Sequence, residues 1–157
     1  MKIIYRTGDL LAAPEQVLCH GCNAQGKMGA GIAVAVRKLY PKAFTDYRQL
    51  YEDQGGRLDL GQCVFVDCPD GRVVIDAVTQ EFYGRDPAIV YVDYDGVRLA
   101  LNRINVWARE HGVTTVAFPK IGAGLANGDW SVIAAIIEEE STDFQPVVYE
   151  LAMATEA

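Results

Sequence analysis

Six short runs of apolar, largely β-branched residues constrain the fold of this chain more than any other feature. The runs fall at residues 3–5, 17–20, 63–66, 73–75, 115–118 and 147–149, and nearly every position in them is apolar. Strands without polar alternation are typical of sheets that are covered on both faces. Because segments with helical spacing lie between the runs, the pattern predicts a three-layer α/β/α domain with a mixed central sheet of about six strands.

Four helices are predicted between these strands. The clearest runs from the N-cap Asp93 to Gly112, with apolar residues recurring at spacings of three and four. A second is expected over residues 32–39, and Pro41 forces a break before a third, polar helix around 44–53. The fourth begins near Trp130. Since no linker or repeat divides the chain, we predict one domain over residues 1–151 and a tail over 152–157.

Composition excludes several classes of protein. The 157 residues, half of them apolar, suffice for one core. Acidic residues outnumber basic ones by 21 to 14, a net charge of −7 with no basic block, so non-specific nucleic-acid binding is not expected. The chain begins without the apolar stretch of a signal peptide or a membrane helix. We therefore expect a cytoplasmic monomer that acts away from membranes.

The four cysteines raise the question of a metal centre. Cys19 and Cys22 lie in and just after one predicted strand, and Cys63 and Cys68 flank another strand. The ends of such a strand are about 17 Å apart at ~3.3 Å per residue, so four sulfurs would not converge on one zinc ion. A redox Cys-x-x-Cys pair normally opens a helix, which this pair does not. We expect reduced thiols, no metal and no cofactor.

Two glycine-rich stretches each follow a predicted strand and precede a predicted helix: the first glycine loop (26–31) and the second glycine loop (122–128). Free backbone N–H groups at a helix start bind anions, and glycine lets the backbone come close to the ligand. Either loop alone could be a tight strand-to-helix connection. Two such loops on one sheet favour a site that binds a diphosphate from both sides, although neither loop matches a P-loop or a dinucleotide-binding fingerprint.

Four separated motifs, in the same order, resemble those of a macro domain. They are residues 8–10 (Gly-Asp-Leu), Asn23 before 26–33 (Gly-Lys-Met-Gly-Ala-Gly-Ile-Ala), 119–125 followed by Trp130, and 148–151 (Val-Tyr-Glu-Leu). The resemblance spans residues 2–151. It is nearest to the small single-domain branch that contains ADP-ribose-1''-phosphate phosphatases and glutamyl ADP-ribose hydrolases. It implies a six-stranded mixed sheet and a cleft that binds ADP-ribose.

The resemblance also assigns ligand contacts. Asp9 would accept a hydrogen bond from the adenine amino group beside the Leu10 N–H, and Leu151 would pack near the adenine. Asn23 would contact the distal ribose, although it could instead cap a turn, as Asp9 could. The other expected contacts lie on or directly beside the two glycine loops and at the end of the fourth strand: Met28, Gly29, Ala30, Gly31, Ile32, Thr79, Gln80, Ile121, Gly122, Ala123, Gly124, Leu125 and Ala126.

By resemblance, Gln80 and Ala126 match the catalytic lysine and aspartate of the glutamyl hydrolases. Neither side chain can form a lysyl adduct or act as a base. The remaining candidates are His20, Asn23 and Asp129. Histidine exchanges a proton near neutral pH, and the phosphatase branch shows a similar His-x-Cys-Asn stretch. Asn23 would position the ribose, whereas Asp129 could activate water or cap the following helix.

We therefore predict a hydrolase that acts on ADP-ribose-1''-phosphate or on another mono-ADP-ribose derivative, such as an acetyl- or nucleobase-linked one. The alternative is a reader module that binds ADP-ribose without turning it over. Lys27 and Arg85 could supply charge to the cleft or be solvated. Because the net charge is negative, we expect backbone N–H groups to carry the binding and salt to affect it little.

Overall fold

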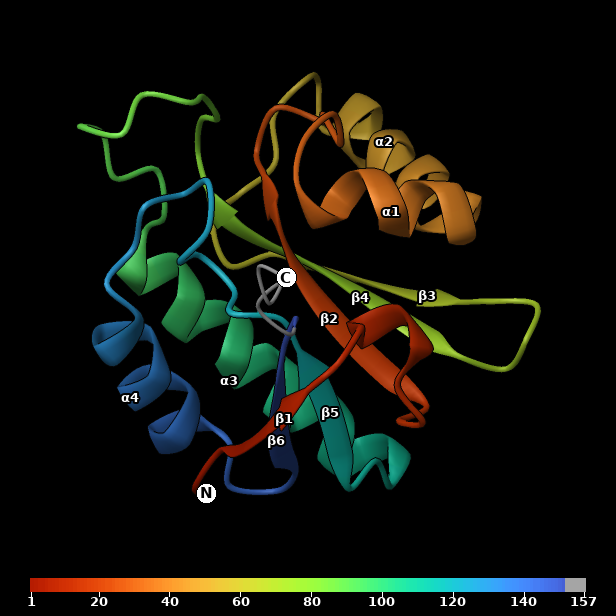
Figure 1. Cartoon of the computed structure of the whole chain (residues 1–157). Helices are drawn as coiled ribbons and strands as arrows, with labels where there is room; N and C mark the ends of the chain where they lie inside the picture. Colours follow the sequence, from red (N-terminus) through yellow and green to blue (C-terminus); the bar gives the residue numbers. More distant parts are fainter. Residues whose placement is uncertain (152–157) are drawn as a thin grey trace, which may run out of the picture.

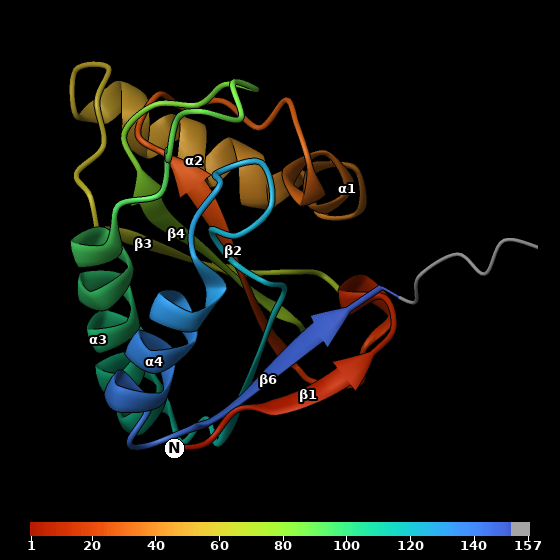
Figure 2. The same cartoon turned by 60° about the vertical axis from the view of Figure 1, so that its left-hand side comes forward.

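The computed structural model describes residues 1–151, which form a six-stranded sheet between two layers of helices (Figure 1). The strand order is β1-β6-β5-β2-β4-β3. Neighbouring strands are parallel except β3 and β4, which are antiparallel, so the predicted mixed sheet is confirmed. Figure 2 shows β6 and β1 side by side at one edge. The strands are β1 (Ile4–Thr7), β2 (Val17–Asn23), β3 (Cys63–Asp67), β4 (Val73–Gln80), β5 (Thr115–Phe118) and β6 (Gln145–Glu150).

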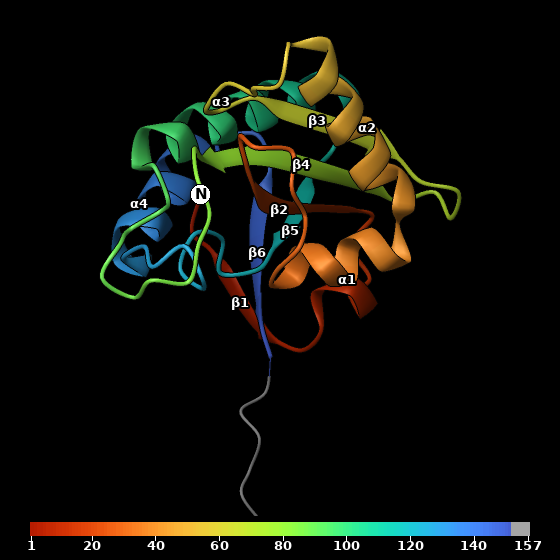
Figure 3. The same ribbon diagram turned by 90° about the horizontal axis from the view of Figure 1, so that it is seen from above.

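The helices divide between the two faces of the sheet, as the view from above shows (Figure 3). One layer holds α1 (Ile32–Leu39) and α2 (Pro41–Asp53), and the other holds α3 (Tyr94–His111) and α4 (Trp130–Glu140). A short 3-10 helix, η1 (Leu10–Ala12), follows β1. None of the described helices is long and apolar enough to cross a bilayer. The predicted tail over 152–157 lies outside the described residues.

Local signals account for the helix ends. The Asp93 side chain accepts a hydrogen bond from the Gly96 N–H at 2.7 Å and caps α3, and Gly112 ends this helix in the left-handed conformation. Pro41 occupies the first turn of α2, where its missing N–H costs nothing, and so separates α2 from α1.

The continuous apolar runs arise because both faces of the sheet are buried. On β2, Leu18 packs into the cluster under α1 and α2, whereas Cys19 packs into the cluster under α3 and α4. On β4, Val74 and Ile75 alternate in the same way. Every position of such a strand must therefore be apolar, unless a polar group finds a partner in the core.

The pairing between β2 and β5 is the feature that positions the site. These central strands are paired at a single position, Leu18 opposite Ala117, whereas β2 and β4 pair along their whole length. The chain leaves β2 toward α1 on one face and leaves β5 toward α4 on the other. Such a switch point, at the carboxyl ends of parallel strands, is where open α/β sheets bind ligands.

Candidate functional site

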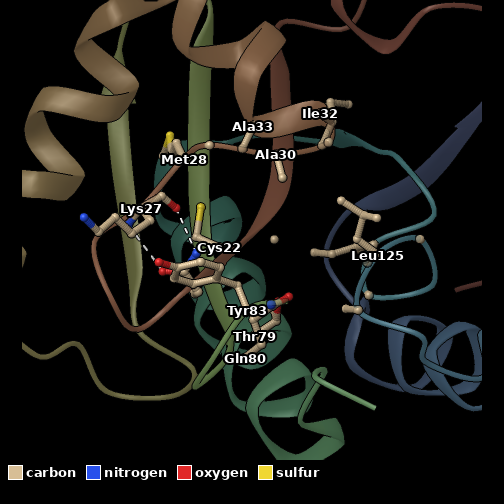
Figure 4. Close-up of a pocket in the computed structure, with 18 of the residues that line it drawn as sticks. Cys22, Lys27, Met28, Ala30, Ile32, Ala33, Thr79, Gln80, Tyr83 and Leu125 are labelled. Atoms are coloured by element: carbon tan, nitrogen blue, oxygen red, sulfur yellow. Dashed lines mark hydrogen bonds between the residues drawn. The ribbon is translucent and has the colours of Figure 1, made fainter. Parts of the chain in front are cut away.

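A cleft of about 850 Å³ opens at the carboxyl ends of β2 and β5, between the two glycine loops (Figure 4). Its size is typical of a site for a small molecule or cofactor. In Figure 4, Leu125 of the second glycine loop reaches toward Ala30 and Ile32 on the other wall. A Cβ atom built on Gly31 would lie 3.5 Å from Leu125 Cδ1, so a side chain at position 31 would contact Leu125.

Asn23 shapes the wall of the cleft that carries the first glycine loop. Its Oδ1 accepts hydrogen bonds from the N–H groups of Gln25 (2.9 Å) and Lys27 (3.3 Å), and its Nδ2 donates to the Lys27 carbonyl (2.8 Å). The hydroxyl of the buried Tyr47 donates a hydrogen bond to the Asn23 carbonyl. Asn23 thus acts as the turn cap that the sequence allowed, and its contact with a ribose stays a prediction.

Gly31 sets the approach to α1. Its φ of 62° and ψ of −147° are open to glycine but strained for other residues, and it gives α1 no side-chain cap. The first N–H groups of a helix have no intrahelical acceptor. At this helix start, no capping side chain competes with an anion in the cleft.

The second glycine loop is built differently. A Cβ on Gly122 would lie 2.7 Å from Val92 Cγ2, and one on Gly128 would lie 2.5 Å from the Gly122 carbonyl, so these glycines serve close packing. Asp129 caps α4 by accepting from the Ser131 N–H at 2.9 Å. Hydrogen bonds from Ser131 hold the pKa of Asp129 below its usual value. The α4 start is therefore already occupied by a carboxylate.

The third wall is formed by Gln80, Tyr83, Gly84 and Arg85, at the start of the segment that leads from β4 to α3. Asn127 anchors it by donating to the carbonyls of Asp86 (3.0 Å) and Ile89 (2.8 Å), and the Tyr91 N–H donates to the Ala126 carbonyl at 2.8 Å. Tyr83, 54% exposed, lies over the cleft (Figure 4). This wall is consequently tied to the second glycine loop.

Most of the residues assigned by resemblance line the cleft. The Thr79 hydroxyl, at its floor, is buried and has no hydrogen-bond partner among the described residues. Gln80 is tethered by a hydrogen bond from its Nε2 to the Phe82 carbonyl at 2.8 Å. The assigned residues that line the cleft are Asn23, Met28, Gly29, Ala30, Gly31, Ile32, Thr79, Gln80, Ile121, Gly122, Gly124, Leu125 and Ala126.

Several assigned residues lie outside this cleft. Asp9 caps η1 by accepting from the Leu11 N–H at 2.9 Å, and Leu10 is buried in the core under α1 and α2. Leu151 is exposed just after β6, and Ala123 packs toward the core under α3 and α4. The adenine contacts assigned to Asp9, Leu10 and Leu151 therefore stay predictions.

The structure also places His20 and Asp129 away from the cleft. His20 has no exposed surface, and its Nε2 lies 2.6 Å from Asp76 Oδ1. Burial raises the pKa of Asp76, against the hydrogen bond and charge of His20, which lower it. In this conformation His20 has no route to a ligand, and Asp129 serves as the α4 cap. Their catalytic roles remain untested predictions.

Cys22, for which the sequence predicts neither a zinc site nor a redox role, lines the cleft. Its Sγ lies 3.7 Å from His20 Nε2 and within 4.8 Å of an Asp76 carboxylate oxygen, so the structure groups it with these two side chains instead of with the other cysteines. Burial, with a smaller effect of Asp76, raises the pKa of the Cys22 thiol well above its usual value. Cys22 is therefore protonated near neutral pH and is a poor nucleophile.

The charge of the lining contrasts with that of the whole chain. Among the described residues, none of those lining the cleft is an Asp or a Glu, although the chain carries 21 of them. Arg37 and Arg48 join the cleft from α1 and α2, and no local sequence signal marked them. The lining cations are Lys27, Arg37, Arg48, Arg85 and Lys120.

Comparisons with known proteins agree with this architecture. The family model described as "Macro domain" matches residues 19–137. ADP-ribose glycohydrolase OARD1 of Bos taurus is 33% identical over 153 residues, covering 96% of this chain and 92% of the relative. ADP-ribose 1''-phosphate phosphatase of Saccharomyces cerevisiae (strain YJM789) is 25% identical over 176 residues, covering 96% and 99%. The solved macrodomain of Mycobacterium tuberculosis DarG has a TM-score of 0.80 at 25% identity, covering 96% of this chain and 98% of that chain.

Proposed function

Because the chain belongs to the macro domain family, we propose that its cleft binds ADP-ribose and that the protein hydrolyses a group linked to the distal ribose. The relatives named above are hydrolases of ADP-ribose derivatives, which supports this class of reaction. One observation carries the proposal: the start of α1, which has no side-chain cap, lines a cleft that Leu125 of the second glycine loop lines from the other side.

In this proposal the diphosphate lies over the first glycine loop. The N–H groups at the start of α1 donate to its oxygens, and Gly31 lets the backbone approach them without a side chain in between. Fixed backbone dipoles of this kind need no reorganisation when charge develops during a reaction. The distal ribose would then lie toward Asn23, with Thr79 and Gln80 on the floor beneath it.

The leading reaction is the dephosphorylation of ADP-ribose-1''-phosphate. A water oxygen bonds to phosphorus while the bond from phosphorus to the C1'' oxygen breaks, which yields ADP-ribose and inorganic phosphate. The cleft cations Lys27 and Arg85 would stabilise the charge on the phosphoryl group. His20 lies buried as the partner of Asp76, and its predicted role as acid or base is tested below with His20→Ala.

A non-catalytic reader is the second candidate. It is favoured by Gln80 and Ala126, which the resemblance matches to the lysine and aspartate of the glutamyl hydrolases, because neither side chain can act as a base. A cytoplasmic monomer without affinity for membranes or for unmodified nucleic acid is also part of the proposal, on the grounds of composition.

Calorimetry with ADP-ribose tests the binding step. Absence of binding at millimolar ligand would rule out both candidates. Phosphate release from ADP-ribose-1''-phosphate, alongside release of ADP-ribose from glutamyl-, O-acetyl- and DNA-linked substrates, separates a hydrolase from a reader. A protein that binds ADP-ribose but turns over none of the four is a reader. Including His20→Ala decides whether that ring takes part, since equal rates per folded molecule would exclude it from the reaction.

A further inference from the structure

Four side chains form a continuous basic corner at the end of the cleft bounded by the first glycine loop, α1 and α2: Lys27, Arg37, Phe44 and Arg48. The Arg37 guanidinium carbon lies 3.7 Å from the centre of the Phe44 ring. Phe44 and Arg48 are one turn apart on α2, and Arg48 Nη1 donates to the Gly26 carbonyl at 3.3 Å. Lys27 is the next residue in the chain after Gly26, so it lies beside Arg48.

The cations of this corner have little compensation from the protein. Among the described residues, Lys27 and Arg37 form no ion pair, and Arg48 has only the exposed Glu52 at 3.3 Å. Surface pairs of this kind contribute little. Grouping like charges is unfavourable unless a ligand neutralises them, and this grouping occurs in a chain with a net charge of −7. The corner therefore offers positive charge that the protein itself does not neutralise, which favours an anionic ligand.

The corner is separate from the groups that would hold the diphosphate. In Figure 4, Lys27 points away from Leu125, toward the opposite side of the cleft. Backbone N–H groups at the start of α1 already face the diphosphate position. The anion that the corner would bind must then lie further along the ligand, beyond the distal ribose that we place at Asn23.

We propose that the basic corner is a second phosphate subsite, which binds a phosphate carried by the group attached to the distal ribose. This inference rests on the proposed function. Arginine binds phosphate oxygens through parallel N–H donors, and stacking on Phe44 holds the Arg37 guanidinium in one orientation before the ligand arrives. The phosphate is either the terminal monoester of ADP-ribose-1''-phosphate or a phosphodiester of a nucleic-acid strand that bears the ADP-ribose.

Displacement of a fluorescent ADP-ribose, read within seconds of mixing, tests the subsite. The competitors are ADP-ribose, ADP-ribose-1''-phosphate, a single-stranded DNA oligonucleotide bearing one ADP-ribose, and an ADP-ribosylated glutamyl peptide without phosphate. The variant is Lys27→Gln/Arg37→Gln. Its matched control is Lys38→Gln/Arg103→Gln, which removes the same charge from exposed positions that do not line the cleft, one of them next to Arg37 on α1.

We expect the corner variant to lose about tenfold in affinity for a phosphate-bearing competitor, the scale of one charge-assisted hydrogen bond. Its affinity for ADP-ribose and for the peptide conjugate should change less than about twofold, and the control should change little with any ligand. A loss confined to ADP-ribose-1''-phosphate identifies the monoester as the ligand, and a loss confined to the oligonucleotide identifies the phosphodiester.

An equal loss for all four competitors would overturn the subsite, because the corner would then act on the ADP-ribose moiety itself. Unchanged affinity for both phosphate-bearing competitors would overturn it as well. In either case ADP-ribose still binds the wild-type protein and the proposed function stands. If ADP-ribose fails to displace the probe from the wild-type protein, the proposed function fails and the subsite fails with it.

Discussion

Asp76 is a charged residue that the fold buries completely. It occupies the middle of β4 between apolar neighbours, fully buried, with His20 as its partner and with its Oδ2 unpaired among the described residues. A buried carboxyl group must be either protonated or paired, because burial of an isolated charge costs far more than folding provides. The pair across β2 and β4 therefore makes the stability of the sheet depend on protonation.

The stability of the fold should consequently depend on pH through Asp76. Burial raises its pKa in the folded state, so the carboxyl group holds its proton to a higher pH than in the unfolded chain. Its contribution to stability is then greatest at low pH and is lost as pH rises from about 4 through the raised pKa. Asp76→Asn, which cannot ionise, removes this dependence.

Urea unfolding of both proteins between pH 4 and pH 7 measures the effect. The free energy of unfolding of the wild type, relative to Asp76→Asn, should fall as pH rises, by at most about 1.4 kcal/mol per pH unit. A difference that stays constant over this range would show that Asp76 has the same pKa in the folded and unfolded states.

Thr79 gives a second prediction at the scale of one residue. Its buried hydroxyl has no hydrogen-bond partner within residues 1–151, so Thr79→Val, which keeps the shape of the side chain, should raise the free energy of unfolding by about 1 kcal/mol. The same change should weaken ADP-ribose binding roughly three- to tenfold if the hydroxyl serves the ligand. Thermal unfolding and calorimetry measure the two effects, and Thr79→Ser, which keeps the hydroxyl, is the control. Lower stability together with unchanged affinity would assign Thr79 to packing alone.

At the scale of elements, the first glycine loop shows that neighbouring glycines have different roles. Gly31 has a positive φ and its position faces Leu125, whereas Gly29 has an ordinary φ and open space around its Cβ position. The Gly-Ala-Gly motif looks uniform in sequence, but only its second glycine needs the conformational freedom.

Gly31→Ala should therefore destabilise the protein by about 1–3 kcal/mol and weaken ADP-ribose binding, because the backbone at the start of α1 would be strained. Gly29→Ala should change stability by less than about 1 kcal/mol in either direction. Thermal unfolding and calorimetry of the two variants supply the comparison. Similar behaviour of both would mean that the loop tolerates either backbone conformation.

For the whole molecule, the fold follows from local patterns more directly than the cleft does. Apolar runs, the Asp93 cap and the Pro41 break are each readable within a few residues, and the three-layer fold with its mixed sheet is confirmed. The cations of the cleft come from separate segments that meet only after folding, so no window of sequence contains them. The burial of His20 likewise depends on Asp76, 56 positions away.

The cleft lining also changes the expected effect of salt. Backbone N–H groups alone, in a protein of charge −7, predicted little dependence. The cations of the basic corner predict instead that affinity for ADP-ribose-1''-phosphate falls about three- to tenfold between 50 and 500 mM NaCl, whereas affinity for ADP-ribose changes little. Calorimetry at several salt concentrations measures the slope. Affinity for ADP-ribose-1''-phosphate that does not change with salt would indicate that backbone N–H groups, and not the cations, carry the binding.

The single pairing between β2 and β5 has a mechanical consequence. The sheet consists of two well-paired halves, β1-β6-β5 and β2-β4-β3, joined in the middle by one rung of their ladder. The first glycine loop belongs to one half and the second to the other. A ligand held by both loops therefore links the two halves of the sheet. Without the ligand, the two halves are joined in the sheet only at Leu18 and Ala117, so ligand binding should reduce their motion relative to each other.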